Sequence, residues 1–163
     1  MKSVLFMSDG KKLRIGDFFY KKERGEVTLV RYAGHKSRVT VPEGVALIAD
    51  ECFSDVKTKE VVLPEGVREI GRRAFYCSAV KKVSLPASVK TVGSGAFDCS
   101  GIESLSINNP NVFFYPEIFD HAYDLKEISF AGTIDEWEKI FEGQTYSATF
   151  SVRFSDGTTK TYQ

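Results

Sequence analysis

The segment VKKVSLPASVKTVGSGAF, residues 80–97, decides the fold because its apolar positions recur along the chain. The Leu85-Pro86 pair recurs in the same phase as Val41-Pro42 and Leu63-Pro64. The last residue of the segment belongs to a series of phenylalanines that are 22 positions apart, namely Phe53, Phe75, Phe97 and Phe119. Such a period is typical of repeat proteins, in which each unit buries its apolar face only against its neighbours. The spacing therefore predicts a stack of similar turns.

Within this unit, Val80, Val83 and Leu85 fall at the first, fourth and sixth places of a predicted strand. Together with the positions that follow, at Val89, Val92-Gly93, Ala96-Phe97, Cys99 and Ile102, the unit resembles the bacterial BspA-type leucine-rich repeat family. The units of that family read L-x-x-I-x-L-P-x-x-V-x-x-I-G-x-x-A-F. The resemblance implies an α/β repeat fold, a right-handed leucine-rich-repeat solenoid with a parallel β-sheet, over residues 38–131.

Two departures from the family pattern stand out. Ala49 replaces the glycine found at Gly71 and Gly93, and residues 108–115, NNPNVFFY, replace the proline and Ile-Gly positions. The fourth unit also has one extra residue, because Ile107 and Phe130 are 23 positions apart. We expect a local bulge in this unit.

The two flanks predict caps for the open ends of the stack. Residues 1–37 form an N-terminal β capping segment with two hairpin-like parts, 4–15 around Ser8-Asp9-Gly10 and 18–32 around Glu23-Arg24-Gly25. Residues 132–163 form a C-terminal helix and hairpin cap. In it, Thr133 and Glu136 have capping-box spacing, and a hairpin turns at residues 155–158.

Charge and hydropathy exclude several classes of partner. The chain has 22 basic and 22 acidic side chains, so its formal net charge of zero provides no attraction for nucleic acid. The sequence has no apolar run long enough to span a membrane. We expect a monomer.

Catalytic and metal motifs are weak. The two histidines, His35 and His121, are expected in solvated loops, and no H-E-x-x-H, paired C-x-x-C or G-x-S-x-G motif occurs. Asp135, Glu136 and Glu138 suit the start of a helix better than acid–base catalysis. We therefore expect no enzyme, no catalytic residue, no cofactor and no metal.

The three cysteines are expected to be buried free thiols, although Cys77 and Cys99 share one phase of adjacent turns. Their odd number, with no export signal in the chain as written, favours a cytoplasmic location. The family resemblance implies the opposite, an extracellular or cell-surface location, if an export signal lies upstream.

Exposed strand positions provide the first candidate binding surface. One predicted ladder comprises Thr40, Val62, Ser84, Ser106 and Ser129, and its neighbour comprises Arg38, Glu60, Lys82, Ser104 and Glu127. The alternating charges of Arg38, Glu60 and Lys82 can neutralise one another across strands about 4.8 Å apart. The alternative is a shallow, hydroxyl-lined surface for a partner.

The aromatic run Phe113-Phe114-Tyr115 provides the second candidate. A strand alternates its faces, so either one of these side chains faces solvent or all three pack beneath the widened turn. The predicted contact surface comprises Phe114 and Tyr115, with the Ser84 and Ser106 strand face beside them and Lys82 and Glu60 on the same sheet.

The resemblance and the lack of a catalytic motif favour a non-catalytic protein–protein interaction module on a leucine-rich repeat solenoid. The alternative is a cell-surface adhesin fragment that binds a host matrix protein or glycan.

Overall fold

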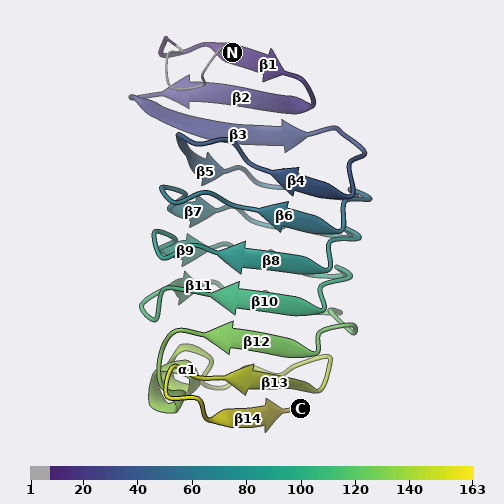
Figure 1. Ribbon diagram of the computed structural model, residues 1–163, viewed down its shortest axis with the longest axis vertical. Helices are drawn as coiled ribbons and strands as arrows, with labels where there is room; N and C mark the ends of the chain where they lie inside the picture. Colours follow the sequence, from purple (N-terminus) through teal and green to yellow (C-terminus); the bar gives the residue numbers. More distant parts are fainter. Residues whose placement is uncertain (1–7) are drawn as a thin grey trace.

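In the computed structural model, which describes residues 8–163, the chain winds into a solenoid whose turns stack along its longest axis (Figure 1). Each repeat turn contributes one strand of two to four residues to each of two sheets, and within each sheet the repeat strands run parallel to one another. The repeats are thus built from strands and turns. The expected solenoid with a parallel β-sheet is confirmed, and its helix content is small, because α-helix among the described residues is confined to the seven-residue α1 (Ile134–Ile140).

The first sheet begins as an antiparallel meander and continues as a parallel ladder. Its strands are β1 (Lys12–Ile15), β2 (Phe18–Glu23), β3 (Glu26–Tyr32), β5 (Val45–Ile48), β7 (Glu69–Ile70), β9 (Thr91–Val92) and β11 (Phe113–Phe114). Their order in space is that same sequence, with β11 last. The predicted hairpin at Glu23-Arg24-Gly25 is confirmed by the β2–β3 pairing. The first strand expected in the other hairpin, at residues 4–7, lies outside the described residues.

The second sheet carries the strands predicted from the repeat pattern. These are β4 (Arg38–Thr40), β6 (Glu60–Val62), β8 (Lys82–Leu85), β10 (Ser104–Ile107), β12 (Glu127–Phe130), β13 (Phe150–Arg153) and β14 (Thr159–Tyr162). Pairing is parallel from β4 through β13 and antiparallel between β13 and β14. The predicted parallel strands are confirmed in their predicted register, with Val61 opposite Val83 and Leu105 opposite Ile128.

The repeat phenylalanines form a column of rings between the two sheets. Neighbouring ring centroids lie 5.3 Å apart between Phe53 and Phe75 and 5.1 Å between Phe75 and Phe97, with the planes nearly parallel. Tyr32 and Phe141 extend the column at its two ends. All four repeat phenylalanines are buried, as predicted. Because each ring contacts the next, the core is continuous along the stack.

Successive turns approach each other closely at Gly71 and Gly93, and this explains both the glycines and the exception at Ala49. A Cβ on Gly71 would lie 2.5 Å from the backbone nitrogen of Asp50, and one on Gly93 would lie 2.6 Å from that of Arg72. A side chain there would push two turns apart. Ala49 follows β5 at the first turn, where its N–H donates to Leu29 of β3 instead of to a repeat turn.

The extra residue for which a local bulge was expected in the fourth unit lies in a turn. Cys99 and His121 are still 22 positions apart and share a left-handed backbone, with φ of 54° and 52°. Ser104 and Glu127, which pair in register on the next strands, are 23 positions apart. The insertion therefore falls in the turn before β12, where Tyr123 is 68% exposed. An exposed turn accepts the residue without breaking either ladder.

At the C-terminal end, α1 begins with the predicted capping box. The Glu136 amide donates to Thr133 Oγ1 (3.3 Å), and the Thr133 amide donates to Glu136 Oε2 (2.7 Å). Trp137 of α1 and Phe141 at its C-terminal cap are buried, and their rings pack against each other. Across residues 8–163, none of the helical structure is both long and apolar enough to cross a membrane.

Candidate functional site

The outer face of the second sheet carries the predicted polar ladders. Arg38 is opposite Glu60, and Glu60 is opposite Lys82, as the repeat phase predicted. Arg38 and Glu60 form an ion pair at 3.5 Å. Farther along, the Ser104 hydroxyl donates to Glu127 (3.0 Å). These side chains of the face thus interact with neighbouring strands, and each interaction is of modest strength because the groups are exposed.

The three consecutive aromatic residues divide between solvent and core. Phe113 is 58% exposed and Tyr115 is 49% exposed, whereas Phe114 is only 5% exposed. The Phe114 ring packs on Phe141 of the C-terminal segment, with centroids 5.2 Å apart. This corrects the assignment of Phe114 to a contact surface, because its side chain belongs to the core.

The predicted contact surface is also divided between the two sheets. Ser84, Ser106, Lys82 and Glu60 lie on β8, β10 and β6, whereas Tyr115 follows β11 of the other sheet. The serine face therefore does not lie beside the aromatic residues. Two separate surfaces result, the polar face of the second sheet and an aromatic surface at the end of the first.

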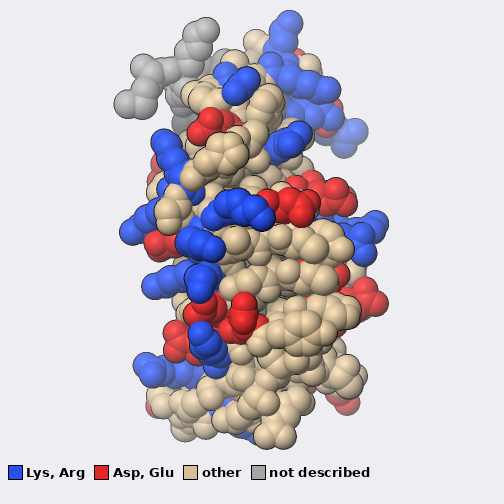
Figure 2. All heavy atoms as spheres, turned by 90° about the vertical axis from the view of Figure 1, so that its right-hand side faces the viewer, with Lys and Arg blue, Asp and Glu red and all other residues tan. Residues whose placement is uncertain are grey.

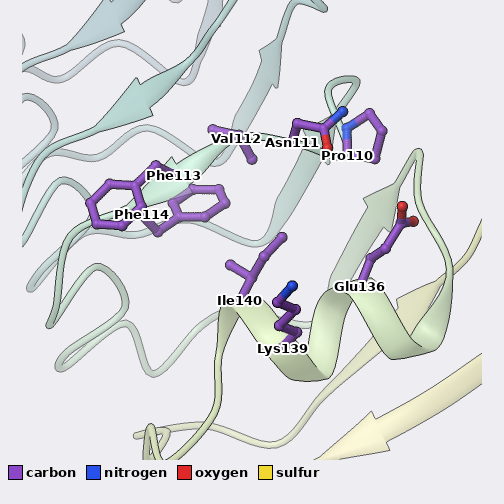
Figure 3. A pocket seen from close by; sticks show the side chains of 8 residues that line it. All are labelled: Pro110, Asn111, Val112, Phe113, Phe114, Glu136, Lys139 and Ile140. Atoms are coloured by element: carbon purple, nitrogen blue, oxygen red, sulfur yellow. The ribbon is translucent and has the colours of Figure 1, made fainter.

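The aromatic surface borders a groove between β11 and α1 (Figure 3). The groove has a volume of about 440 Å³. Phe113 and Phe114 lie on one side, and Ile140, Lys139 and Glu136 face it from α1. Pro110, Asn111 and Val112 complete the wall. We call Phe113, Tyr115 and this groove the aromatic corner.

The repeat phase contains the information needed to separate Phe113 from Phe114. Phe114 pairs with Val92, which pairs with Ile70, and both of these are buried. Phe113 instead pairs with Thr91, which is opposite the exposed Glu69. Reading the phase through residues 108–115 would have identified Phe113 and Tyr115 as the exposed pair.

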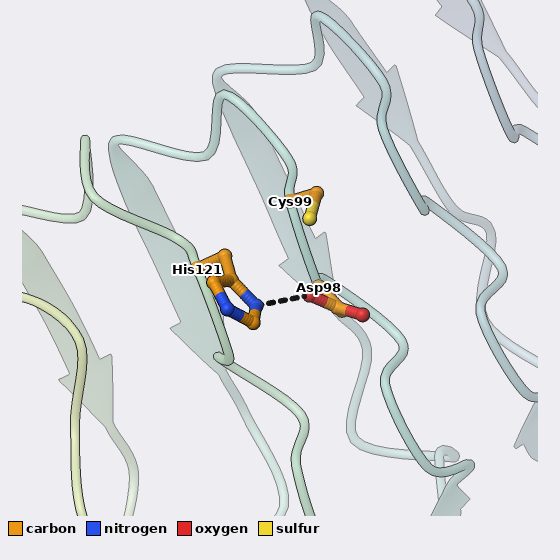
Figure 4. Close-up of side chains that lie close together, drawn as sticks. All are labelled: Asp98, Cys99 and His121. Atoms are coloured by element: carbon orange, nitrogen blue, oxygen red, sulfur yellow. Dashed lines mark hydrogen bonds and ion pairs between the residues drawn. The ribbon is translucent and has the colours of Figure 1, made fainter.

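A second cluster lies on the turns that join the two sheets, where Asp98, Cys99 and His121 project close together (Figure 4). His121 Nδ1 and Asp98 Oδ1 are 3.1 Å apart. Cys99 and Cys77 are exposed, and Cys52 alone is buried, which corrects the expectation of three buried thiols. All three cysteines are free. The structure therefore brings together a thiol, an imidazole and a carboxylate that sequence analysis treated separately.

The pKa values of the Cys99 and Cys52 thiols are raised, which favours the protonated form of both. Desolvation raises the pKa of Cys99 to about 11, and hydrogen bonding and charge at Asp98 add to the rise. Burial raises the pKa of Cys52 further above its ordinary range. Neither cysteine has the lowered pKa of a catalytic nucleophile.

Basic and acidic side chains are intermixed on the edge of the stack that carries Asp98, Cys99 and His121. Figure 2 shows this edge, where blue and red groups gather in the upper half and along one border, and much of the lower half is uncharged. Glu103 contacts both Lys81 and Lys126, the latter at 2.7 Å. These hydrogen bonds lower the pKa of Glu103 to about 2, with the Lys126 bond contributing most.

Solved structures with the same fold come from bacteria. A leucine-rich repeat protein from Bacteroides capillosus is similar with a TM-score of 0.65 and 22% identity, over 74% of this chain and 99% of that one. A leucine rich cell surface protein from Faecalibacterium prausnitzii is similar with a TM-score of 0.54 and 18% identity, over 91% of this chain and 55% of that one. The T. pallidum leucine rich repeat protein has a TM-score of 0.50 and 19% identity, over 73% of this chain and 71% of that one.

The comparison with curated protein sequences returns no match. The family model described as the BspA type leucine rich repeat region matches residues 32–146 in six copies. This span begins before and ends after the predicted repeat region of 38–131, because it includes the end of β3 and the α1 segment. It covers more than half of the chain. The chain therefore belongs to the BspA-type leucine-rich repeat family.

Proposed function

We propose that this chain is a non-catalytic protein-binding module and that the aromatic corner is its principal contact surface. The observation that carries this proposal is the exposure of Phe113 on β11 and of Tyr115 immediately after it, at 58% and 49%. Their rings meet edge to face at 5.0 Å. Large aromatic residues are enriched among the side chains that dominate binding energy at protein interfaces.

The corner is held in place before any partner arrives. The Phe113 amide donates to Lys90 (2.8 Å), and the Tyr115 amide donates to Val92 (2.9 Å). Phe114, between them, is fixed in the core against Phe141. Because the strand is already ordered, a partner that binds here loses less conformational entropy than it would on a mobile loop.

The groove beside the aromatic pair favours a polypeptide segment with an apolar anchor. Val112 and Ile140 provide aliphatic lining, and Glu136 and Lys139 place opposite charges at the rim. β11 is also the last strand of its sheet, so one edge has no further strand paired to it among residues 8–163. An apolar centre with a polar rim is the usual anatomy of a protein interface.

The experiment maps contacts by photo-crosslinking in cells. A photoreactive phenylalanine analogue is placed at Phe113, at Tyr123 and at Ser106, one position per protein. Tyr123 is an exposed aromatic residue away from the groove, and Ser106 lies on the outer face of the second sheet. We expect one discrete crosslinked protein from position 113. The same product from position 106 but not from 113 would move the contact surface to the polar sheet.

The second candidate is display at the cell surface as an adhesin fragment for a host matrix protein or glycan. A leucine rich cell surface protein is among the similar structures, and this similarity supports the fold alone at 18% identity. The three free thiols favour a reducing compartment instead. Antibody labelling of intact cells tests display, since an intracellular protein is labelled only after the cells are opened.

A further inference from the structure

Four successive turns carry residues with metal-ligating side chains at the same place in the repeat. Asp55, Cys77, Cys99 and His121 are each 22 positions apart and all have a left-handed backbone, with φ of 59°, 50°, 54° and 52°. The Cys77 amide donates to the backbone carbonyl of Asp98 (3.1 Å), and the Cys99 amide donates to that of Asp120 (2.9 Å). These bonds hold the turns in register, so the side chains form a column along the edge of the stack.

At the C-terminal end of this column, three different ligand groups come together. The Asp98 carboxylate, the Cys99 thiol and the His121 ring each offer one atom, and these atoms all lie within 4.8 Å of one another (Figure 4). Tetrahedral zinc with bonds of about 2.0 to 2.3 Å places its ligand atoms about 3.3 to 3.8 Å apart. The 3.1 Å separation of Asp98 Oδ1 and His121 Nδ1 is already near that value.

A fourth ligand is next in the column. Cys77 precedes Cys99 by one turn in the same phase, and the bond from its amide to the Asp98 carbonyl holds the two turns together. Cys77 and His121 are exposed, and Asp98 is the least exposed of the cluster, with 17% of its side chain accessible. The Asp98 carboxylate therefore gives a fixed reference. The exposed Cys77 thiol is outside the group of atoms within 4.8 Å and would turn toward it to complete a tetrahedron.

We propose that Asp98, Cys99 and His121, with Cys77 as the fourth ligand, bind a divalent zinc ion. Two thiolates and an imidazole select zinc over the hard cations magnesium and calcium, which prefer all-oxygen sites. The ion would join the three successive turns that carry Cys77, Cys99 and His121. The last of these turns is bonded to the C-terminal segment, because the His121 amide donates to Ser147 Oγ (3.0 Å). The site is separate from the aromatic corner and does not depend on the proposed protein-binding function.

The competing interpretation is a plain hydrogen bond between His121 and Asp98 beside two unrelated thiols. Under that interpretation, metal ions would bind weakly and without regard to Cys99. The two interpretations differ in stoichiometry, in the identity of the ligand atoms and in the response to substitution. All three can be measured on the whole chain.

The test titrates metal-free, reduced protein with Co²⁺, whose absorption reports tetrahedral geometry and thiolate ligation, and then displaces Co²⁺ with Zn²⁺. We expect one ion per chain with a thiolate-to-cobalt charge-transfer band, which weakens by about half in Cys77→Ser. Replacing any one of the three clustered ligands should weaken Co²⁺ binding at least about tenfold, in the variants His121→Ala, Cys99→Ser and Asp98→Asn. His35→Ala is the matched control, because His35 is the other histidine and lies outside the column.

Folding of each variant is checked by circular dichroism before titration. Asp98→Asn retains the shape and one acceptor of the carboxylate, so it keeps the test valid if a larger change unfolds the turn. Zinc should also protect Cys99 from alkylation in the wild type and not in His121→Ala. Equal binding by the wild type and His121→Ala, or a cobalt spectrum without thiolate bands, would overturn the proposal.

Discussion

Single positions in this protein are governed by their place in the repeat. Phe113 and Phe114 are adjacent and chemically identical, yet one faces solvent and the other packs on Phe141. The difference follows from strand alternation and from the neighbouring turns, which place Val92 and Ile70 at the position of Phe114. Residue type alone predicts neither outcome.

The stacked column predicts a large loss of stability when one ring is removed. Phe75 is fully buried and contacts the rings of both Phe53 and Phe97. Phe75→Ala leaves a cavity that the rigid turns cannot close, and should lower the free energy of unfolding by about 3 to 5 kcal/mol. Denaturant unfolding measures this. Tyr123→Ala, at an exposed turn, is the control and should change stability by no more than about 0.5 kcal/mol.

The ion pairs of Glu103 with Lys126 and Lys81 should provide a part of the folding stability that is lost in acid. Its pKa is about 2 in the folded protein against 4.5 as the ordinary value, so below about pH 4.5 the unfolded chain binds more protons at this site. The contribution is complete above pH 4.5 and disappears as the pH falls toward 2. Unfolding free energy should therefore fall less steeply with acid in Glu103→Gln than in the wild type. Identical slopes between pH 5 and pH 2 would show that the two lysines do not stabilise the carboxylate.

At the scale of elements, α1 depends on its N-terminal cap because the helix is only seven residues long. Short helices are marginal in isolation, and this one is held by burial of Trp137 and by the reciprocal bonds of Thr133 and Glu136. The helix also forms one wall of the aromatic corner. Stability of the cap and shape of the groove are therefore coupled.

Removing the cap should loosen α1 without unfolding the repeats. Thr133→Ala leaves the Glu136 amide without its acceptor and should cost about 1 kcal/mol. Amide hydrogen exchange in α1 should accelerate by roughly fivefold, while exchange in β8 and β10 stays unchanged. Thr133→Ser keeps the hydroxyl and should exchange like the wild type. Unchanged exchange in Thr133→Ala would mean that packing alone holds the helix.

Sequence pattern predicted the elements well where one repeat resembles the next. The parallel strands, the phenylalanine column and the Thr133 capping box all have local or periodic patterns, and all three are confirmed. The two-residue strands β7, β9 and β11 of the first sheet were missed, because such short strands leave almost no periodicity of their own. The extra residue was assigned to the right unit but to no position within it, because the spacing of Ile107 and Phe130 gives the added length and not where it falls.

On the scale of the whole molecule, the candidate sites arise from contacts that no single unit contains. The aromatic corner combines a departure from the repeat pattern with a helix about 20 residues farther along the chain. The Asp98, Cys99 and His121 cluster spans two turns, and the shared phase of Cys99 and His121 was its only trace in the sequence. The repeat spacing places Cys99 and His121 on one edge of the stack. The structure is needed to show that their ligand atoms and that of Asp98 lie within 4.8 Å of one another.

The central claim is that the aromatic corner supplies the binding energy for a protein partner. Its most direct test is the affinity of the purified crosslinked partner for four proteins, namely the wild type, Phe113→Ser, Tyr115→Ser and the matched control Tyr123→Ser. Each of the two corner variants should weaken binding by about 30-fold, corresponding to a loss of about 2 kcal/mol, with little change in melting temperature because the side chains are exposed. Tyr123→Ser should bind like the wild type. Equal affinities for all four proteins would contradict the account.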